Sequence, residues 1–192
     1  YDSSTGVLTI TGQASKENYQ TALRSITYHS TSEDPTITSD DRTVTWVVTD
    51  ADSDDAGAES SIAVTSTINI IPINDAPVMS AGSTLSYSEN EAATIIDNTI
   101  TITDDDDIEI DGGTATITSG FTEGDTLTLT TQFGISGTYD SSTGVLTIDG
   151  TASLSEYETA LRSVGYHSTS VDPTITSFDR IITWAVTDAN SD

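Results

Sequence analysis

The chain has 192 residues, a formal net charge of −26 and no cysteine. Its 31 acidic residues against 5 basic ones argue against nucleic acid and anionic membrane surfaces as partners, because like charges repel. The lack of cysteine excludes disulfides and cysteine-ligated metals, and no apolar run is long enough for direct insertion into a membrane.

The first segments predict short strands around one helix. A turn-rich lead-in precedes Val7–Ile10, which has the composition of a short strand. Apolar residues then recur at helical spacing within Ser15–Ser25, which predicts a short helix, and Ile26–Ser30 follows as another short strand. The buried stripe of the helix is expected to consist of Tyr19, Ala22, Leu23 and Ile26.

Two longer segments alternate between apolar and polar residues, the period of a half-buried strand. They are Arg42–Thr49 and Ser60–Ile70, separated by an acidic loop over residues 50–57. Because successive side chains of a strand point to opposite faces, one face of each segment is predicted to face a core. The predicted inward residues are Val44, Trp46 and Val48 in the first segment and Ile62, Val64, Ile68 and Ile70 in the second.

Two prolines, Pro72 and Pro77, punctuate the segment that follows. Proline cannot donate to a strand ladder and biases its neighbours to extended backbone, so residues 73–78 are predicted to form a short, stiff linker. Residues 1–72 then form the C-terminal part of one domain, and residues 79–192 belong to the next domain.

The second domain is also predicted to be rich in short strands. Alternating or β-branched residues mark Thr84–Tyr87, Thr94–Thr103, Thr114–Thr118 and Thr126–Thr131 as strands. A full domain would hold roughly seven or eight strands at a spacing of about 8–12 residues, which is typical of an antiparallel β-sandwich. The predicted fold class is therefore all-β.

Tyr139–Asp192 repeats Tyr1–Asp54 at an offset of 138 residues without a gap, and 40 of the 54 aligned residues are identical. A repeat of this length indicates tandem domains rather than a short-repeat solenoid. In the second copy of the predicted helix, Ser153 and Glu156 have the spacing of a capping box. We therefore expect one short helix in each repeat.

The phase of the repeat also predicts where the domains end. At the same offset, the second domain would end near position 210, so the counterpart of its last strand, Ser60–Ile70, falls outside the 192 residues. The first domain would lack its opening strands. An open sheet edge recruits another strand, so head-to-tail self-association is expected, whereas neighbouring repeats would fill both gaps in a longer chain.

Clusters of aspartate carry the strongest chemical signal. Adjacent carboxylates repel one another unless a cation screens them, and carboxylates at alternate loop positions can converge on Ca²⁺, which prefers hard oxygen ligands. A generally acidic, salt-tolerant surface is the alternative interpretation. The candidate ligands in these clusters are Asp104, Asp105, Asp106 and Asp107, the loop residues Asp50, Asp52 and Asp54, and their repeat counterparts Asp188, Asn190 and Asp192.

Several short motifs resemble those of cadherin repeats. They are Tyr-Asp-x-x-Thr-Gly-Val-Leu at residues 1–8 and 139–146, Asp104–Asp107 after Thr101–Thr103, Val186-Thr187-Asp188, Ser88-Glu89-Asn90, and Ile73-Asn74-Asp75-Ala76-Pro77. The whole chain resembles the cadherin-like, immunoglobulin-like tandem repeats of large bacterial RTX-type surface adhesins, which depend on calcium.

This resemblance implies tandem antiparallel β-sandwich domains with Ca²⁺ at the domain junctions. It implies a non-catalytic, calcium-rigidified extender module of a secreted or cell-surface adhesin, extracellular and involved in cell adhesion and biofilm formation. Neighbouring repeats of the same chain would be its partners. The ligands that it implies near the linker and in the early Glu-Asn motif are Asn74, Asp75, some of Asp104–Asp107, Asp188, Asn190, Glu89 and Glu91.

Two other function classes have less support in the sequence. A repeated glycan- or protein-binding module is the alternative, but glycan sites usually need exposed aromatic residues, and only 6% of the residues are aromatic. An enzyme is not expected, because Ser, His and Asp are present without a nucleophile-elbow sequence. His29 and His167 occupy one repeat position, and a strand-surface role is expected for both.

Overall fold

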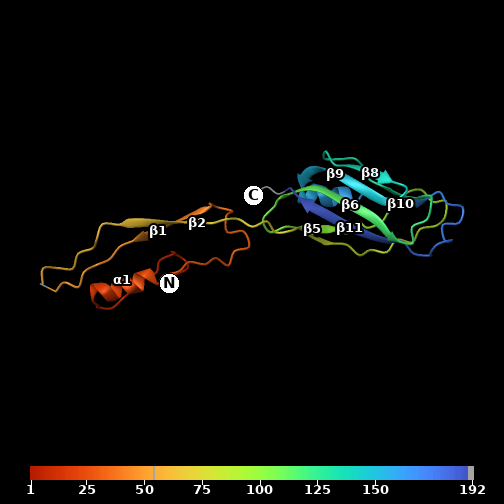
Figure 1. Cartoon of the computed structure of the whole chain (residues 1–192). Coiled ribbons are helices and arrows are strands. Elements are labelled where there is room, and N and C mark those ends of the chain that lie inside the picture. Colours follow the sequence, from red (N-terminus) through yellow and green to blue (C-terminus); the bar gives the residue numbers. More distant parts are fainter. Residues whose placement is uncertain (54, 190–192) are drawn as a thin grey trace. The chain divides into compact units, whose positions relative to one another are not determined.

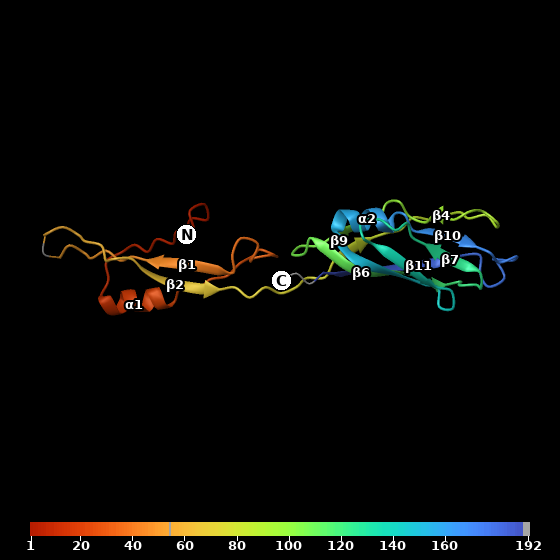
Figure 2. The same cartoon turned by 90° about the horizontal axis from the view of Figure 1, so that it is seen from above.

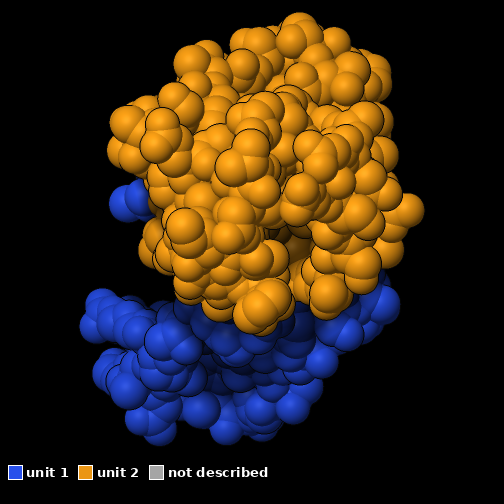
Figure 3. Space-filling view, turned by 90° about the vertical axis from the view of Figure 1, so that its right-hand side faces the viewer, with its two compact units in different colours: residues 1–71 blue, residues 72–192 orange. Residues whose placement is uncertain are grey.

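The computed structural model describes residues 1–53 and 55–189. It divides into two compact units, Tyr1–Ile71 and Pro72–Asp192 (Figure 3). Residues 73–78, the segment predicted to be a linker, group with the second unit, and Val78 already begins a strand there.

The first unit consists of one helix and one two-stranded antiparallel sheet (Figure 1). Helix α1 (Lys16–Arg24) starts after Ser15, whose hydroxyl accepts a hydrogen bond from the Asn18 amide at 3.3 Å. Strands β1 (Asp41–Trp46) and β2 (Val64–Asn69) pair so that Asp41 lies opposite Asn69 and Trp46 opposite Val64. None of the described residues of this unit is buried, so the described part of the unit lacks a hydrophobic core.

The second unit is built on a four-stranded antiparallel sheet with the order β11-β6-β9-β8, whose strands are labelled in Figure 1; Figure 2 shows β11, β6 and β9 from above. Its members are β6 (Glu109–Ser119), β8 (Ser136–Asp140), β9 (Val145–Ser153) and β11 (Ile181–Asp188). Strand β11 is the outer strand next to β6, and its alternating burial shows that one of its faces is directed toward the core.

Shorter strands and one helix complete the second unit. Strand β10 (Gly165–Ser168) lies between β4 (Thr94–Ile95) and β7 (Asp125–Thr128), and β3 (Val78–Ser80) pairs with β5 (Thr101–Thr103). Helix α2 (Leu154–Leu161) connects β9 to β10. All the pairings are antiparallel, which confirms the predicted all-β, sandwich-like fold with one short helix in each unit.

The core of the second unit combines residues of its three sheets with the helix. Helix α2 begins with the predicted capping box, in which the Ser153 side chain faces the backbone amide of Glu156 and Glu156 Oε2 accepts a hydrogen bond from the Ser153 amide at 3.1 Å. This N-terminal cap sets the residue at which the helix begins, and the apolar stripe of the helix faces inward. The buried apolar residues are Ile100, Ile102, Ile110, Ala115, Ile117, Leu127, Ile135, Leu146, Ile148, Ala152, Tyr157, Ala160, Leu161, Val164 and Tyr166.

Several predicted elements are absent or differ. Val7–Ile10, Ile26–Ser30 and Thr84–Tyr87 are not strands, although the counterparts of the first two, in β9 and β10, are. Ile62 and Val64 were expected to point inward, but their side chains are 88% and 58% exposed. These predictions fail because a buried strand needs both a paired neighbour and a core to cover: Val64 is paired with Trp46 but has no core beside it, whereas residues 84–87 pack against the core through Leu85 and Tyr87 but have no strand partner among the described residues.

Candidate metal centre

Four consecutive aspartates connect β5 to β6 in the second unit. Asp104 Oδ1 accepts hydrogen bonds from the amides of Asp106 and Asp107 at 3.3 and 3.1 Å, which folds the segment back over its first residue. The segment is partly withdrawn from water: Asp104 and Asp106 are half-buried and Asp107 is 2% exposed, whereas Asp105 is exposed. Carboxylates are therefore held close together with restricted access to solvent.

Residues 74 and 75 contact this acidic segment and the end of β11. The Asp75 amide donates a hydrogen bond to Asp106 Oδ2 at 2.9 Å. The Asn74 side-chain amide donates to Asp188 Oδ2 at 3.3 Å, and Asp188 is the last residue of β11. Segments more than 30 residues apart in the chain, and a third more than 110 residues away, thus meet at one end of the second unit.

Two carboxylate oxygens in this cluster are buried without a hydrogen-bond partner among the described residues: Asp104 Oδ2 and Asp106 Oδ1. No described arginine or lysine forms a salt bridge with either residue. Burial raises the pKa of the Asp104 carboxyl above its usual value, and the adjacent Asp106 carboxylate raises this pKa further. A buried carboxylate oxygen with no donor is costly, and a bound cation is one way to offset that cost.

The cluster is not a preformed metal cage. Within residues 1–53 and 55–189, no three His, Cys, Asp or Glu side chains are placed to hold a metal ion together. The residues that do meet at this end are Asn74, Asp75, Asp104, Asp106, Asp107 and Asp188. Their chemistry fits a hard cation, because they offer carboxylate and amide oxygens and include two buried oxygens without donors.

The other predicted ligands lie elsewhere. Asp50 and Asp52 belong to the first unit, where their Oδ1 atoms accept hydrogen bonds from loop amides, at 3.2 Å from Glu59 and 2.7 Å from Gly57. Their carboxylates thus stabilise their own loop. Asp54, Asn190 and Asp192 lie outside the described residues. Asp105 is exposed and points to no partner that the structure records.

Glu89 and Glu91 flank Asn90 in a turn at the other end of the second unit. The hydroxyl of Tyr87, which comes just before the turn, accepts a hydrogen bond from the Ser168 amide at 3.1 Å, so the turn lies beside the end of β10. Glu91 Oε2 accepts a hydrogen bond from the Ser88 amide at 2.9 Å and so closes the turn. These two glutamates do not join the aspartate cluster.

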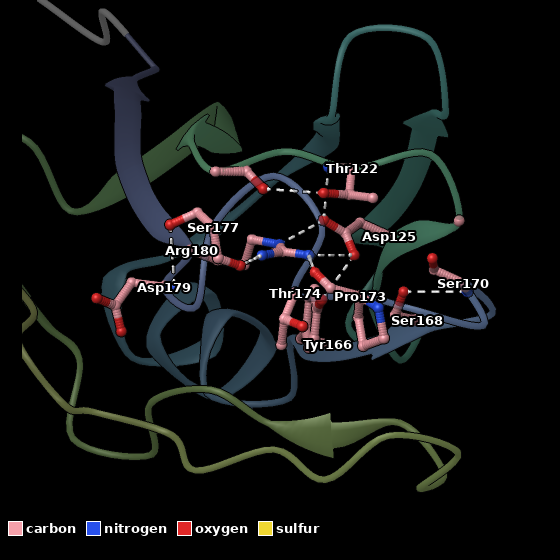
Figure 4. A network of polar contacts seen from close by, with 12 residues as sticks. Thr122, Asp125, Tyr166, Ser168, Ser170, Pro173, Thr174, Ser177, Asp179 and Arg180 are labelled. Carbon is pink, nitrogen blue, oxygen red and sulfur yellow. Dashed lines mark hydrogen bonds and ion pairs between the residues drawn. The ribbon is translucent and has the colours of Figure 1, made fainter.

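A second polar network, which the sequence did not predict as a site, surrounds Asp125 (Figure 4). Arg180 Nε lies 2.6 Å from Asp125 Oδ2, and the Tyr166 hydroxyl donates to Oδ1 at 2.7 Å. Burial opposes ionisation of Asp125, but Arg180, Tyr166 and the Thr122 amide hold its pKa below the usual value. The polar groups around Asp125 find their hydrogen-bond and ion-pair partners within the protein, so we assign this network a structural role.

Asp97 is a third buried carboxylate, and it is 3% exposed. It accepts hydrogen bonds from the amides of Gly82, Ser83 and Thr99 at 2.7–3.0 Å. Burial works against its charge, but these donors lower its pKa well below the usual value. The sequence signal that could have indicated it is the Asp97-Asn98-Thr99 turn pattern, in which an aspartate accepts from the amide two residues later.

The two histidines of the repeat differ in their surroundings. His29 is exposed, and His167 lies in β10 with a buried Nδ1 that has no hydrogen-bond partner in the described part of the chain.

Neither helix described by the structure is long and apolar enough to cross a bilayer.

Comparison with known proteins shows a similarity to one very long protein. The chain is 37% identical over 108 residues to halomucin from Haloquadratum walsbyi, an alignment that covers 53% of this chain but 1% of halomucin. The chain thus corresponds to a very small part of that relative's length. The similarity suggests a repeat of a large surface protein. No family model matches the chain, and no solved structure matches it.

Proposed function

We propose that this chain is a non-catalytic extender module of a large secreted or cell-surface protein of the adhesin kind, stiffened by Ca²⁺ at the end of the second unit. The module would hold other parts of a long extracellular protein away from the cell, in contact with neighbouring repeats. Adhesion and biofilm formation would be the work of the whole protein. The proposal assigns no reaction to the chain.

One contact carries the proposal: the hydrogen bond from the Asp75 amide to Asp106 Oδ2 at 2.9 Å. It joins the segment that enters the second unit to the acidic turn, where Asp104 and Asp106 keep buried oxygens without donors. Carboxylates from the acidic turn, from Asp75 and from Asp188 would hold the ion, with Asn74 contributing an amide oxygen. When bound, Ca²⁺ would supply positive charge that offsets the repulsion among these groups.

The extender role is supported by the repeat and by the match to halomucin. Two copies of one 54-residue block occur at a fixed offset, which is typical of a tandem array. Halomucin is far longer than this chain, and the similarity to it suggests a surface-protein repeat. In an array, rigidity depends on how firmly the segment that enters each domain is fixed to that domain, which is the position of the Asp75 contact.

Calorimetric titration of the 192-residue chain with CaCl₂, in a background of excess NaCl, tests the metal site. We expect saturable binding and a higher melting temperature in Ca²⁺ than in chelator, because a ligand that binds only the folded state stabilises it. Asp106→Asn removes one charge at the cluster and should weaken binding by about tenfold or more, which corresponds to about 1.4 kcal/mol.

Asp105→Asn is the matched control, because it removes the same charge from the adjacent exposed residue. It should leave Ca²⁺ affinity nearly unchanged. Equal effects of the two substitutions would instead support a diffuse acidic surface that tolerates salt. Identical melting curves in Ca²⁺ and in chelator, at constant ionic strength, would refute the calcium proposal.

A further inference from the structure

The acidic turn at Asp104–Asp107 is attached to helix α2 at both of its ends. Before the turn, the amide of Ile102 in β5 donates a hydrogen bond to Glu158 Oε1 at 2.9 Å. After the turn, the Ile108 carbonyl accepts a hydrogen bond from the amide of Leu154, the first residue of the helix, at 3.2 Å. One turn of α2, which is labelled in Figure 2, therefore holds the two points at which the chain enters and leaves the acidic turn.

A second side chain of the helix completes the contact with β5. Arg162 Nε donates to the Ile100 carbonyl at 2.8 Å, and Arg162 Nη2 lies 2.9 Å from Glu158 Oε2. Backbone groups of residues two apart point to the same edge of a strand, so Ile100 and Ile102 offer these groups on the edge that β3 does not use. The carboxylate accepts as a strand carbonyl would, and the guanidinium donates as a strand amide would. The Glu158–Arg162 pair thus takes the place of a neighbouring strand.

These contacts are made where water has little access. Ile100 and Ile102 are 0% and 4% exposed, and the Glu158 side chain is 19% exposed. Hydrogen bonds with an ionised partner are stronger than neutral ones, and a buried backbone group that loses its partner is costly. The pair therefore fixes β5 relative to the helix more firmly than apolar packing alone would.

The position of β5 decides where the acidic turn begins. Asp104 follows Ile102 by two residues, and its Oδ1 accepts the amides of Asp106 and Asp107. A shift of β5 along the helix would move all of these carboxylates together, away from Asp75, which comes from a different segment. Groups that bind a metal must be held to within about 0.5 Å of their productive positions. Residues that hold such groups therefore affect affinity without touching the ion.

We propose that Glu158 and Arg162 are positioning residues of the metal centre, which replace a strand at the edge of β5 and so set the place of the acidic turn. Neither side chain is a ligand. The consequence for Ca²⁺ affinity rests on the proposed function, whereas the effect on the backbone of β5 does not. The two parts are therefore tested by separate measurements.

Arg162→Met separates positioning from simple electrostatics, because the two effects have opposite signs. Removal of a positive charge near an acidic site should by itself strengthen cation binding. Loss of positioning should instead weaken Ca²⁺ binding by about tenfold or more, as is typical when a residue that orients a metal ligand is removed. Calorimetric titration of the 192-residue chain measures this change. Arg24→Met, the same substitution at the exposed counterpart in the first unit, should leave the affinity unchanged. Equal or tighter binding by Arg162→Met would overturn the proposal.

Two substitutions of Glu158 remove the same charge but differ in hydrogen bonding. Glu158→Gln keeps an oxygen that can accept from the Ile102 amide, and glutamine is the residue at the corresponding position of the first repeat, Gln20. Glu158→Met keeps the length of the side chain but offers no oxygen. We expect Glu158→Gln to retain most of the Ca²⁺ affinity and Glu158→Met to lose about tenfold. Equal losses in the two variants would show an effect of charge alone and would contradict positioning.

Hydrogen exchange in the presence of chelator tests the structural part without calcium. Peptides that cover residues 100–108 should exchange several-fold faster in Arg162→Met than in the native chain, whereas β9 should keep its protection. Ser163→Ala is the control for general loosening of the helix, because the Ser163 hydroxyl bonds to Ala160 and Thr130 instead of β5. Unchanged exchange in Arg162→Met, or equal acceleration by the control, would overturn the positioning role. If the native chain bound no Ca²⁺, the proposed function would fail, and this experiment would still decide whether the pair holds β5.

Discussion

The two copies of the repeated block share their local contacts. The Tyr157 hydroxyl donates to the Gly150 carbonyl at 2.6 Å, and the Tyr19 hydroxyl donates to the Gly12 carbonyl at the same distance. The hydroxyls of the two serines that follow the helices, Ser163 and Ser25, donate to the carbonyl three residues earlier at 2.6 and 2.7 Å. Contacts within a few residues are thus reproduced wherever the sequence is reproduced.

The two copies differ in everything that depends on distant segments. Tyr157 and Leu161 are fully buried in the second unit, whereas their counterparts Tyr19 and Leu23 are only half-buried. Arg180 pairs with Asp125, but its counterpart Arg42 contacts only backbone carbonyls among the described residues. The comparison separates what the repeated block encodes by itself from what the preceding 60 or so residues of a domain must supply.

The largest difference between the copies is expected at the buried ion pair. Arg180→Ala should lower the free energy of unfolding of the second unit by roughly 3–5 kcal/mol, because it leaves the fully buried Asp125 carboxylate without its cation. The measurement is hydrogen exchange by mass spectrometry on the intact chain, which reports protection in both units from one sample. The control is Arg42→Ala, the same change at the same repeat position, which should cost little.

A core truncation gives the next largest contrast. Leu161→Ala should destabilise the second unit by about 2–5 kcal/mol, because it leaves a cavity beside the buried residues of α2. Leu23→Ala should cost much less, since Leu23 faces no built core. Urea denaturation of the two variants, compared with the native chain, measures both values. If Leu23→Ala were as damaging, the first unit would have a packed interior that the described residues do not show.

Acid sensitivity should be greatest in the second unit, which holds the buried carboxylates Asp97 and Asp125, and its effect should be smaller than that of the core truncation. The pKa values of Asp97 and Asp125 are depressed in the folded chain. Their stabilising contribution is therefore present above the unfolded-state value, about 3.9, and is lost as the pH falls toward the folded-state values. Asp97→Asn should cost about 1–3 kcal/mol at neutral pH and flatten the acid limb of the stability curve. Denaturation series from neutral pH to pH 2 provide the test.

Asp104 acts in the opposite direction in that experiment. Its folded pKa is raised, so its contribution is present below the unfolded-state pKa and is lost as the pH rises through the folded value. Acidification should first relieve the repulsion near Asp104 and only then weaken the unit through Asp97 and Asp125. A monotonic loss of stability from pH 7 downward in the Asp97→Asn variant would contradict this order.

Sequence periodicity predicted the parts of the fold that local interactions decide. The helices, the capping box at Ser153 and Glu156, and the strand that contains Trp46 all follow from residue spacing within one turn or one strand. Periodicity could not predict which apolar faces are covered, because Ile62 and Val64 have a strand pattern but no core beside them. Whether a pattern becomes a buried strand depends on partners far away in the chain.

The candidate metal centre shows the same division. The run Asp104–Asp107 was evident from composition, and its meeting with Asp75 was expected from the resemblance to cadherin repeats. The loop aspartates Asp50 and Asp52 carried a similar pattern, yet in the structure they accept hydrogen bonds from their own loop amides. Nothing in the local pattern indicated the Asp125–Arg180 pair, because the two residues are 55 positions apart.

The contact between Asp75 and Asp106 has a mechanical consequence. Tension applied at Pro72 would travel through residues 73–77 into β3, which is joined to β5 by only three residue pairs, from Val78–Thr103 to Ser80–Thr101. The Asn74–Asp188 and Asp75–Asp106 hydrogen bonds precede those pairs along the load path, so these two contacts bear the force first. Separation of β3 from β5 would then lengthen the chain by a few residues while the four-stranded sheet stays folded. This end of the unit would therefore yield under tension before the main sheet unfolds.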